Sequence, residues 1–278
     1  KYHPGGPYFV AEFYPAWFDV WGQRHSTVDY KRPAEQLDWM LGQGVSVSMY
    51  MFHGGTNFWY MNGANTAGGY RPQPTSYDYD APLGEWGNCY PKYYAFREVI
   101  QKHLPHGTVL PEVPADNPTT TFATIELKES APLQAAFHQT TESENVLSME
   151  DLGVDFGYIH YQTTINKAGK QKLIIQDLRD YAVILVDGKQ VASLDRRYNQ
   201  NNVMLDIQKA PATLEILVEN TGRVNYGPDI LFNRKGITNQ VLCGDEKLTG
   251  WSITPLPLYK EKVSEMNFGE SIQGKPAF

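Results

Sequence analysis

Short apolar and aromatic runs flank one amphipathic stretch at the start of the chain, a pattern that predicts a β–α–β unit. Residues 7–14 (PYFVAEFY) have the composition of a strand. A helix is predicted to begin near Pro33 and to end at Gly42 and Gly44. Residues 45–52 (VSVSMYMF) predict a second strand, and their continuous apolar character favours burial on both faces of a parallel sheet.

The pattern changes twice in the following residues. Residues 53–91, rich in Gly, Asn, Tyr and Pro, form a segment too long for a simple connector, and such loops are usually functional or disordered. Residues 92–103 have helical spacing of apolar positions. Residues 105–121 contain four prolines, a composition typical of a stiff, extended linker. The expected division is therefore a first domain over 1–104 and a linker over 105–121.

Residues 122–258 predict an all-β domain. Short apolar runs recur between turn signals, and no amphipathic helix of useful length interrupts them. Asp187-Gly188 lies between two such runs and marks a tight hairpin. This spacing favours an antiparallel sandwich. The predicted strands are 157–165, 172–177, 182–186, 190–194, 202–207, 213–219 and 248–254. Residues 259–278 show no clear pattern, and 276–278 read as the opening of another strand after a linker to a further β-domain.

Composition narrows the classes of protein. The net charge is −7 with no basic stripe, which argues against nucleic acid as a partner. No apolar run is as long as a membrane helix, so no membrane partner is expected. Cys89 and Cys243 cannot build a disulfide framework or a cysteine zinc site. Residues 1–104 contain 23 aromatic residues, whereas the remaining 174 residues contain only 13. This uneven distribution indicates either an aromatic core or a cleft whose rings stack on a flat ligand such as a sugar ring.

Glu12 is the most informative single residue, because it interrupts an apolar and aromatic run. An ionised carboxylate buried there would be costly unless it were paired. At the C-terminal end of a parallel strand it would instead face a ligand site, as catalytic residues do in (β/α)₈ barrels. The residues alone leave both interpretations open, with Arg24 or His25 as the partner in the first.

Two loops that follow the predicted strands carry further candidate chemistry. Residues 14–25 combine Trp17 with Asp19, Trp21 and His25, either a sugar-binding mixture of rings and polar groups or a loop packed on a sheet rim. Residues 53–58 hold a Gly-Gly turn but no phosphate-loop Lys.

Residues 75–83 alternate aromatic and acidic side chains. In an extended segment Tyr77 and Tyr79 would point one way, and Asp78 and Asp80 the other. A tyrosine hydroxyl from this loop could orient a carboxylate nucleophile; the alternative is a solvated loop with surface tyrosines. The histidines lack metal-ligand spacing, so no metal is expected, and without a Gly-x-Ser-x-Gly motif no serine nucleophile is indicated. We expect no cofactor.

Taken together, these motifs resemble β-galactosidases of glycoside hydrolase family 35. The resemblance rests on an ordered set spread over about ninety residues, and the β-rich part also resembles the family's accessory domain at 217–227 and 248–256. The motifs of the first part are Glu12-Phe13-Tyr14, Trp17, Asp19, Trp21-Gly22, Tyr50-Met51-Phe52, Gly54-Gly55-Thr56-Asn57-Phe58, Asn62-Gly63-Ala64-Asn65 and 75–83.

The resemblance implies a specific fold and activity. The fold would be the C-terminal part of a (β/α)₈ TIM barrel followed by a galactose-binding-like antiparallel β-sandwich. The reaction would be retaining hydrolysis of terminal β-galactosyl residues, with a galactoside as substrate. By the motif match Glu12 is the nucleophile. Tyr50, Tyr79 and Trp17 match residues that line the galactose pocket, and Tyr77 is a further substrate-binding candidate.

The chain also departs from the family. Val10-Ala11 precedes Glu12 where many members have Asn-Ser or Cys-Ser, Pro15-Ala16 replaces other small residues, and Val20 stands where His is frequent. The family's acid/base Glu follows an Asn on an earlier strand, and no Asn-Glu dipeptide occurs in this chain. We therefore expect a segment of a longer protein, with the acid/base upstream, that does not catalyse at full rate alone.

Two other functions fit parts of the same sequence. One is a non-catalytic carbohydrate-binding protein with a relict barrel, and the other is a purely structural role for residues 122–256, favoured by their single Trp. The only Asn-x-Ser/Thr triplet, at Asn117, is excluded by Pro118. That absence favours a periplasmic or secreted bacterial protein over a lysosomal one.

Overall fold

The computed structural model describes residues 5–270 and divides into two compact units. The first comprises residues 1–62 and 73–121, and the second comprises 63–72 and 122–278. The ten residues 63–72, which lie within the long segment 53–91, thus belong with the all-β part of the chain. Residues 276–278, predicted to open a further strand, lie outside the described residues.

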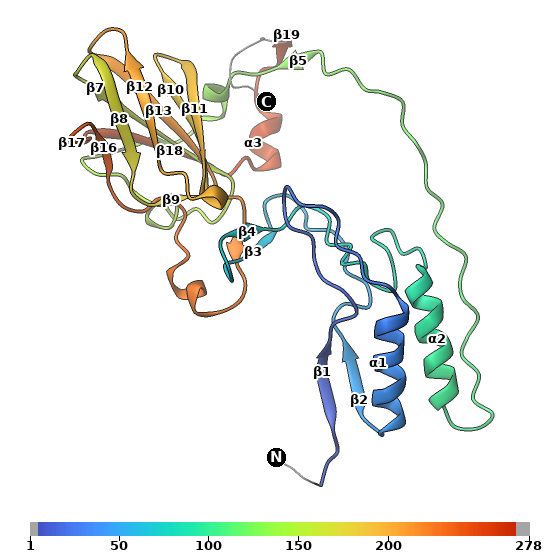
Figure 1. Ribbon diagram of the computed structural model, residues 1–278. Helices are drawn as coiled ribbons and strands as arrows, with labels where there is room; N and C mark the ends of the chain where they lie inside the picture. Colours follow the sequence, from blue (N-terminus) through green and yellow to red (C-terminus); the bar gives the residue numbers. More distant parts are fainter. Residues whose placement is uncertain (1–4, 271–278) are drawn as a thin grey trace. The chain divides into compact units, whose positions relative to one another are not determined.

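The first unit contains the predicted β–α–β arrangement. Strand β1 (Phe9–Phe13) pairs in parallel with β2 (Ser46–Met49), and α1 (Lys31–Gly42) connects them. Helix α2 (Pro91–His103) lies beside α1 (Figure 1). One core joins Phe13 of β1, Leu37 of α1 and Phe96 of α2. The predicted strand and helix positions are confirmed to within a few residues.

The prediction that the second strand is buried on both faces is wrong. In β2 the exposed Ser46 and Ser48 alternate with the half-buried Val47 and Met49. Val47 and Met49 face the helices, because both pack against the core of α1 and α2. The serines lie on the opposite face of this two-stranded sheet, which is open to solvent, so only one face receives apolar cover.

The second unit is built around two antiparallel sheets, as predicted. The larger sheet has the order β11-β10-β13-β7-β18-β6 and the smaller the order β12-β8-β16-β17 (Figure 1). The strands of these two sheets are β6 (Thr141–Ser143), β7 (Tyr158–Ile165), β8 (Gly169–Ile175), β10 (Tyr181–Val186), β11 (Lys189–Asp195), β12 (Asn202–Ile207), β13 (Ala212–Glu219), β16 (Val241–Cys243), β17 (Glu246–Lys247) and β18 (Trp251–Leu256).

A single apolar cluster fills the space between these sheets. Tyr161 and Trp251 come from the larger sheet, Leu173 and Val241 from the smaller, and all four are almost fully buried. In β13 buried positions alternate with half-buried ones along all eight residues, so one face of that strand packs into the core. The arrangement is a sandwich. Cys89 and Cys243 are free thiols.

Shorter elements complete the second unit. They include the five-residue helix α3 (Lys260–Ser264), and no helix within residues 5–270 is long and apolar enough to cross a bilayer. Further short strands are β5 (Glu129–Ser130), β9 (Leu178–Arg179), β14 (Arg223–Val224), β15 (Gly236–Ile237) and β19 (Gly269–Glu270). The 3₁₀ turns are η1 (Leu133–Ala136), η2 (Glu150–Leu152), η3 (Arg196–Tyr198) and η4 (Pro228–Phe232).

The segment 63–72 is bound into the second unit by backbone pairing and by a buried charge pair. Its strands β3 (Gly63–Asn65) and β4 (Arg71–Pro72) form a small sheet with β14. The buried Tyr70 donates a hydrogen bond to Asp180 over 2.8 Å, and Lys235 Nζ lies 2.6 Å from the same carboxylate. Burial favours a neutral Asp180, but Lys235 and Arg196 outweigh it and hold the pKa of this carboxyl below its usual value.

Candidate functional site

Glu12 lies on the surface of the first unit, near the C-terminal end of β1. The register of β1 against β2 shifts between Val10 and Phe13, so a bulge surrounds Glu12. Its carboxylate is exposed and accepts a hydrogen bond from the Tyr14 hydroxyl. The structure therefore does not show the buried Glu12 paired with Arg24 or His25 that was the alternative interpretation. His25 binds Asp19 instead.

Aromatic rings gather beside this carboxylate. Tyr50 follows β2 directly, and since β1 and β2 are parallel it lies at the same end of the sheet as Glu12. The Tyr14 ring is 5.5 Å from Trp17 and 6.1 Å from Tyr50, and Tyr79 lies 5.9 Å from Tyr50. The four rings form a continuous cluster, because Trp17 and Tyr79 are 6.4 Å apart.

Tyr77 completes the cluster at the side of Tyr79. Their rings are 5.6 Å apart, and the Tyr77 hydroxyl lies 3.4 Å from that of Tyr50. Burial raises the pKa of both Tyr77 and Tyr79, and Tyr50 beside each raises it further. Both phenols therefore stay protonated at neutral pH and remain hydrogen-bond donors. All five residues that the sequence singled out, Glu12, Trp17, Tyr50, Tyr77 and Tyr79, thus lie in one region.

The loop that carries Tyr77 and Tyr79 turns at Tyr79 and Asp80 and is not extended there. Tyr79 and Asp80 have φ values of 67° and 49°, so side chains no longer alternate between two sides. Asp78 is buried and accepts hydrogen bonds from Glu85 N and the Tyr90 hydroxyl, both over 3.1 Å. The tyrosines are not those of a solvated loop, since only 1% of Tyr79 is exposed.

Two neighbouring segments hold this turn in place. Gly54 approaches so closely that a Cβ would lie 1.8 Å from the carbonyl oxygen of Tyr77, which explains the glycine of the 53–58 motif. Backbone hydrogen bonds from Asn57 to Thr75 and from Tyr77 to Gly55 fasten the two loops together. From α2, the buried Lys92 donates to the Asp80 carboxylate over 2.8 Å. The site is therefore supported by a helix and not by loops alone.

The Asp19–His25 pair closes the loop between β1 and α1. Asp19 accepts from His25 Nδ1 and from Ser26 N, each over 2.7 Å. Sequence reasoning placed both residues in this loop but did not predict their pairing. It also missed the hydrogen bond from Tyr14 to Glu12, although the spacing of two residues within the motif was a signal for it. Within residues 5–270 the side chains form no cluster suited to a metal ion.

A pH-dependent contribution to stability follows from this pair. The hydrogen bond to Asp19 raises the pKa of His25 above its usual 6.5, so folding gains stability from the protonated ring below that pH and loses it as the pH rises through the folded-state pKa. We expect Asp19→Asn to remove a pH-dependent gain of only a few tenths of a kcal/mol, because the ring is exposed and screened. Urea unfolding at about pH 5.5 and 8 measures it. If the unfolding free energy of Asp19→Asn differed between the two pH values as much as that of the unaltered protein, the assignment would be contradicted. His25→Gln, which removes the titrating ring, tests the same contribution from the other partner.

Two family models match parts of this chain. Residues 1–103 match the family model for glycosyl hydrolases family 35, and residues 146–257 match that for the first all-beta domain of beta-galactosidase. These matches define a glycoside hydrolase segment joined to an all-β domain. The resemblance to glycosyl hydrolases family 35 seen in the sequence is thereby confirmed, with the family match lying in residues 1–103.

Curated relatives extend the likeness along the chain. A beta-galactosidase of Xanthomonas manihotis is 40% identical over 282 residues, covering 100% of this chain and 47% of the relative. Those of Mus musculus and Homo sapiens are 41% and 38% identical, each over 92% of this chain and 40% and 38% of their own length. The chain thus spans less than half the length of these relatives.

Among solved structures, a GH2 beta-galacturonidase from Eisenbergiella tayi bound to galacturonate has 21% identity and a TM-score of 0.27. The match covers 48% of this chain and 26% of that one. A likeness at this level supports no inference about this chain.

Proposed function

We propose that this chain supplies the nucleophile and the sugar-facing aromatic residues of a retaining β-galactosidase. The observation that carries the proposal is the exposed Glu12 carboxylate, held by the Tyr14 hydroxyl beside the rings of Trp17, Tyr50 and Tyr79. The relatives are beta-galactosidases, and their name gives the substrate class that we propose, a β-galactoside. The parallel β1–β2 pair with its helix supports the further proposal that residues 1–104 are the C-terminal part of a (β/α)₈ barrel.

In the proposed reaction Glu12 attacks the anomeric carbon of a terminal, non-reducing β-D-galactosyl residue. The bond to the leaving-group oxygen breaks as a carboxylic acid protonates that oxygen, and a galactosyl ester forms on Glu12. The same acid, now a carboxylate, removes a proton from water, which attacks the ester and releases galactose with retained configuration. Tyr14 holds Oε2, so we assign the attack to Oε1. Tyr77, as a neutral donor, would bind a sugar oxygen, and Trp17 would form a wall against the ring. Tyr79, which is almost fully buried, would pack behind Tyr50 and Trp17 and keep their rings in place.

The second carboxyl group is proposed to lie upstream of Lys1, about 5–5.5 Å from Glu12 as retaining hydrolysis requires. No Asn-Glu dipeptide of the family type occurs in this chain. We therefore expect residues 1–278 alone to hydrolyse a nitrophenyl galactoside poorly. Export to a bacterial periplasm or to the medium remains our proposal for localisation, supported by the lack of glycosylation triplets.

A slow substrate tests the nucleophile directly. A 2-deoxy-2-fluoro-β-galactosyl fluoride slows both steps, because the fluorine at C2 disfavours the positively charged transition state. Its fluoride leaves without an acid's help, so the ester accumulates even where the acid/base residue is weak or missing. We expect mass spectrometry to find one galactosyl label, on the peptide that holds Glu12.

Two outcomes would contradict this expectation. A label on another carboxylate would move the nucleophile elsewhere. Hydrolysis of a nitrophenyl galactoside without any label would argue against a covalent intermediate. The Glu12→Gln variant is the control and should stay unlabelled. If the parent protein neither hydrolyses a galactoside nor takes up the label, the alternative function, a non-catalytic carbohydrate-binding protein with a relict barrel, would replace this proposal.

A further inference from the structure

Glu85 is a half-buried residue of the first unit that the proposed reaction does not use. It stands on the tight turn between Leu83 and Cys89, which pair across an antiparallel bridge. Gly84 N donates to the carbonyl oxygen of Asn88 over 2.8 Å, and a Cβ on Gly84 would lie 2.2 Å from Oδ1 of Asn88. The turn leaves no room for a side chain at Gly84, so the backbone that carries Glu85 is fixed by its surroundings.

Each carboxylate oxygen of Glu85 accepts a hydrogen bond from a different loop. The Thr56 hydroxyl donates to Oε1, and the Ser76 hydroxyl donates to Oε2 over 2.6 Å. Thr56 and Ser76 are themselves opposite each other in an antiparallel bridge, so their side chains lie on the same side of the two loops. One carboxylate thus joins the loop that follows β2 to the loop that carries Tyr77.

The backbone of Glu85 adds two contacts to the same loops. Its N–H donates to Asp78 Oδ2 over 3.1 Å, and its carbonyl oxygen lies 3.3 Å from His53 Nε2. The two carboxylate oxygens, the N–H and the carbonyl oxygen of this residue are therefore all engaged, with partners in 53–56 and 76–78. A residue bound in this way keeps the two loops at a fixed spacing.

Tyr77 lies within the segment that Glu85 holds. It follows Ser76 directly, and its N–H donates to the carbonyl oxygen of Gly55 over 2.9 Å. Its hydroxyl lies 3.4 Å from the hydroxyl of Tyr50. Because Ser76 and Tyr77 share a peptide bond, loosening Ser76 would displace the Tyr77 hydroxyl from its place beside Tyr50.

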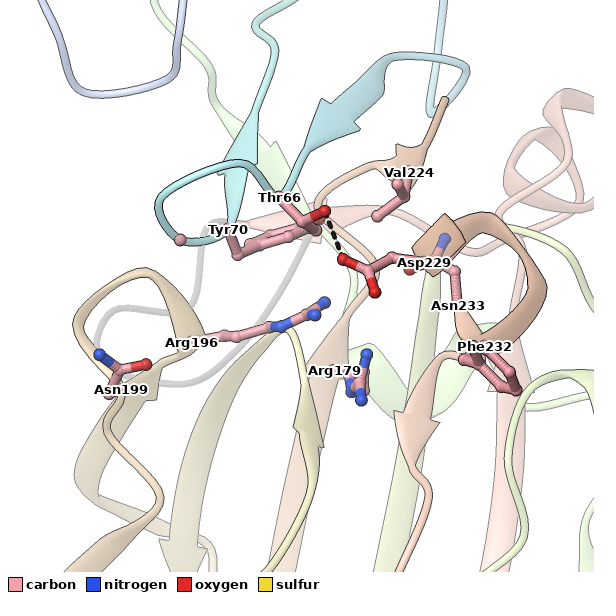
Figure 2. A pocket seen from close by; sticks show the side chains of 10 residues that line it. Thr66, Tyr70, Arg179, Arg196, Asn199, Val224, Asp229, Phe232 and Asn233 are labelled. Carbon is pink, nitrogen blue, oxygen red and sulfur yellow. Dashed lines mark hydrogen bonds between the residues drawn. The ribbon is translucent and has the colours of Figure 1, made fainter. Parts of the chain in front are cut away.

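A contact of the same kind in the second unit has no such neighbour. The Thr66 hydroxyl donates to the Asp229 carboxylate over 2.6 Å and ties the segment 63–72 to η4 (Figure 2). Both residues belong to the all-β unit, and the proposed reaction uses neither. The pair therefore offers a matched comparison, a hydrogen bond from a threonine to a carboxylate that touches none of the sugar-facing rings.

We propose that Glu85 is a positioning residue for the galactoside, which fixes the Tyr77 hydroxyl by holding Ser76 and Thr56. This role rests on the proposed function, in which Tyr77 binds a sugar oxygen. Glu85 acts through Tyr77 and takes no part in the covalent step, so it supports the bound substrate and the transition state equally. Loss of such an interaction raises KM and leaves kcat unchanged.

Steady-state kinetics with a nitrophenyl β-galactoside, in the longer protein that we propose carries the acid/base residue, test this role. Glu85→Leu should raise KM about three- to tenfold, the effect of one lost hydrogen bond to the sugar, and keep kcat within about twofold. Glu85→Gln should keep KM within about twofold, because its amide can accept from one hydroxyl and donate to the other. An unchanged KM in Glu85→Leu would overturn the proposal. A loss of kcat in Glu85→Gln would also overturn it, since the charge of Glu85 would then take part in the chemistry.

Thr56→Val and Thr66→Val form a matched pair that perturbs the fold less than Glu85→Leu. Each removes one hydrogen bond from a threonine to a carboxylate, and valine keeps the shape of the side chain. We expect KM to rise about two- to fivefold in Thr56→Val and to stay unchanged in Thr66→Val. Equal KM values in the two variants would contradict the positioning role, even where Glu85→Leu fails to fold.

A signal from Tyr77 itself separates this role from the proposed function. 3-Fluorotyrosine at position 77 reports the surroundings of the ring by ¹⁹F NMR without any turnover. Glu85→Leu should shift or broaden the signal, and Glu85→Gln should leave it close to that of the unaltered protein. An unmoved signal in Glu85→Leu would overturn the positioning role. A moved signal in a protein that hydrolyses no galactoside would contradict the proposed function alone, since Glu85 would still hold Tyr77.

Discussion

Glu12→Gln is expected to lower galactoside hydrolysis by at least about 10³-fold, because an amide cannot form the galactosyl ester on which the proposed reaction depends. Glutamine has the same shape, and Glu12 is exposed, so the free energy of unfolding should change by no more than about 0.5 kcal/mol. The measurement is kcat/KM for a nitrophenyl β-galactoside, made in the longer protein that we propose carries the acid/base residue.

Two further variants serve as comparisons for Glu12→Gln. Tyr14→Phe removes the hydrogen bond to the Glu12 carboxylate but keeps the ring against Trp17 and Tyr50. Hydrogen bonds to charged groups contribute about 1.5–3 kcal/mol, so a loss of about ten- to a hundredfold is expected. Glu98→Gln, on the exposed face of α2, should have no effect. Unchanged turnover in Glu12→Gln would remove this residue as nucleophile.

Lys235→Met is expected to destabilise the second unit by about 3–5 kcal/mol, the usual result of breaking a buried ion pair from one side. Lys235 is fully buried, and its ammonium lies 2.6 Å from Asp180 and 2.6 Å from the carbonyl oxygen of Gly222. Burial lowers the pKa of Lys235 to about 8, while Asp180 opposes that effect. Methionine fills the space but leaves Asp180 buried with fewer partners.

Hydrogen exchange read by mass spectrometry localises this effect. Peptides from β13, in the centre of the larger sheet, should exchange faster in Lys235→Met. The segment 63–72 should lose protection most, because Tyr70 shares the same carboxylate. Lys189→Met, on an exposed hairpin strand, is the control and should exchange like the unaltered protein. Equal exchange in both variants would mean that the buried pair contributes little to stability.

The local pattern of the sequence predicted most elements, for identifiable reasons. In β13 the apolar side chains recur every second residue, and this period alone specifies a strand with one buried face. Asp187-Gly188 predicted the hairpin between β10 and β11, and both residues have the positive φ that such a turn requires, 50° and 73°. The motif match also selected Glu12, Trp17, Tyr50, Tyr77 and Tyr79, which the fold brings together.

Other features depend on contacts that no local pattern records. The turn at Tyr79 and Asp80 is held by Lys92 from α2, so the alternating aromatic and acidic residues of 75–83 did not reveal whether this segment is extended. β2 was expected to be buried on both faces, but its serines face solvent because the sheet has a single cover of helices.

The sequence by itself thus determined the strand and helix positions, the family and the candidate catalytic carboxylate. Each of these depends on residues that are close together in the sequence. Only the tertiary structure decided that the ten residues 63–72 belong to the all-β unit and that Asp180 binds both Tyr70 and Lys235. These partners are 110 and 55 residues apart in sequence from Asp180, and a buried charge takes whichever partner folding brings within reach.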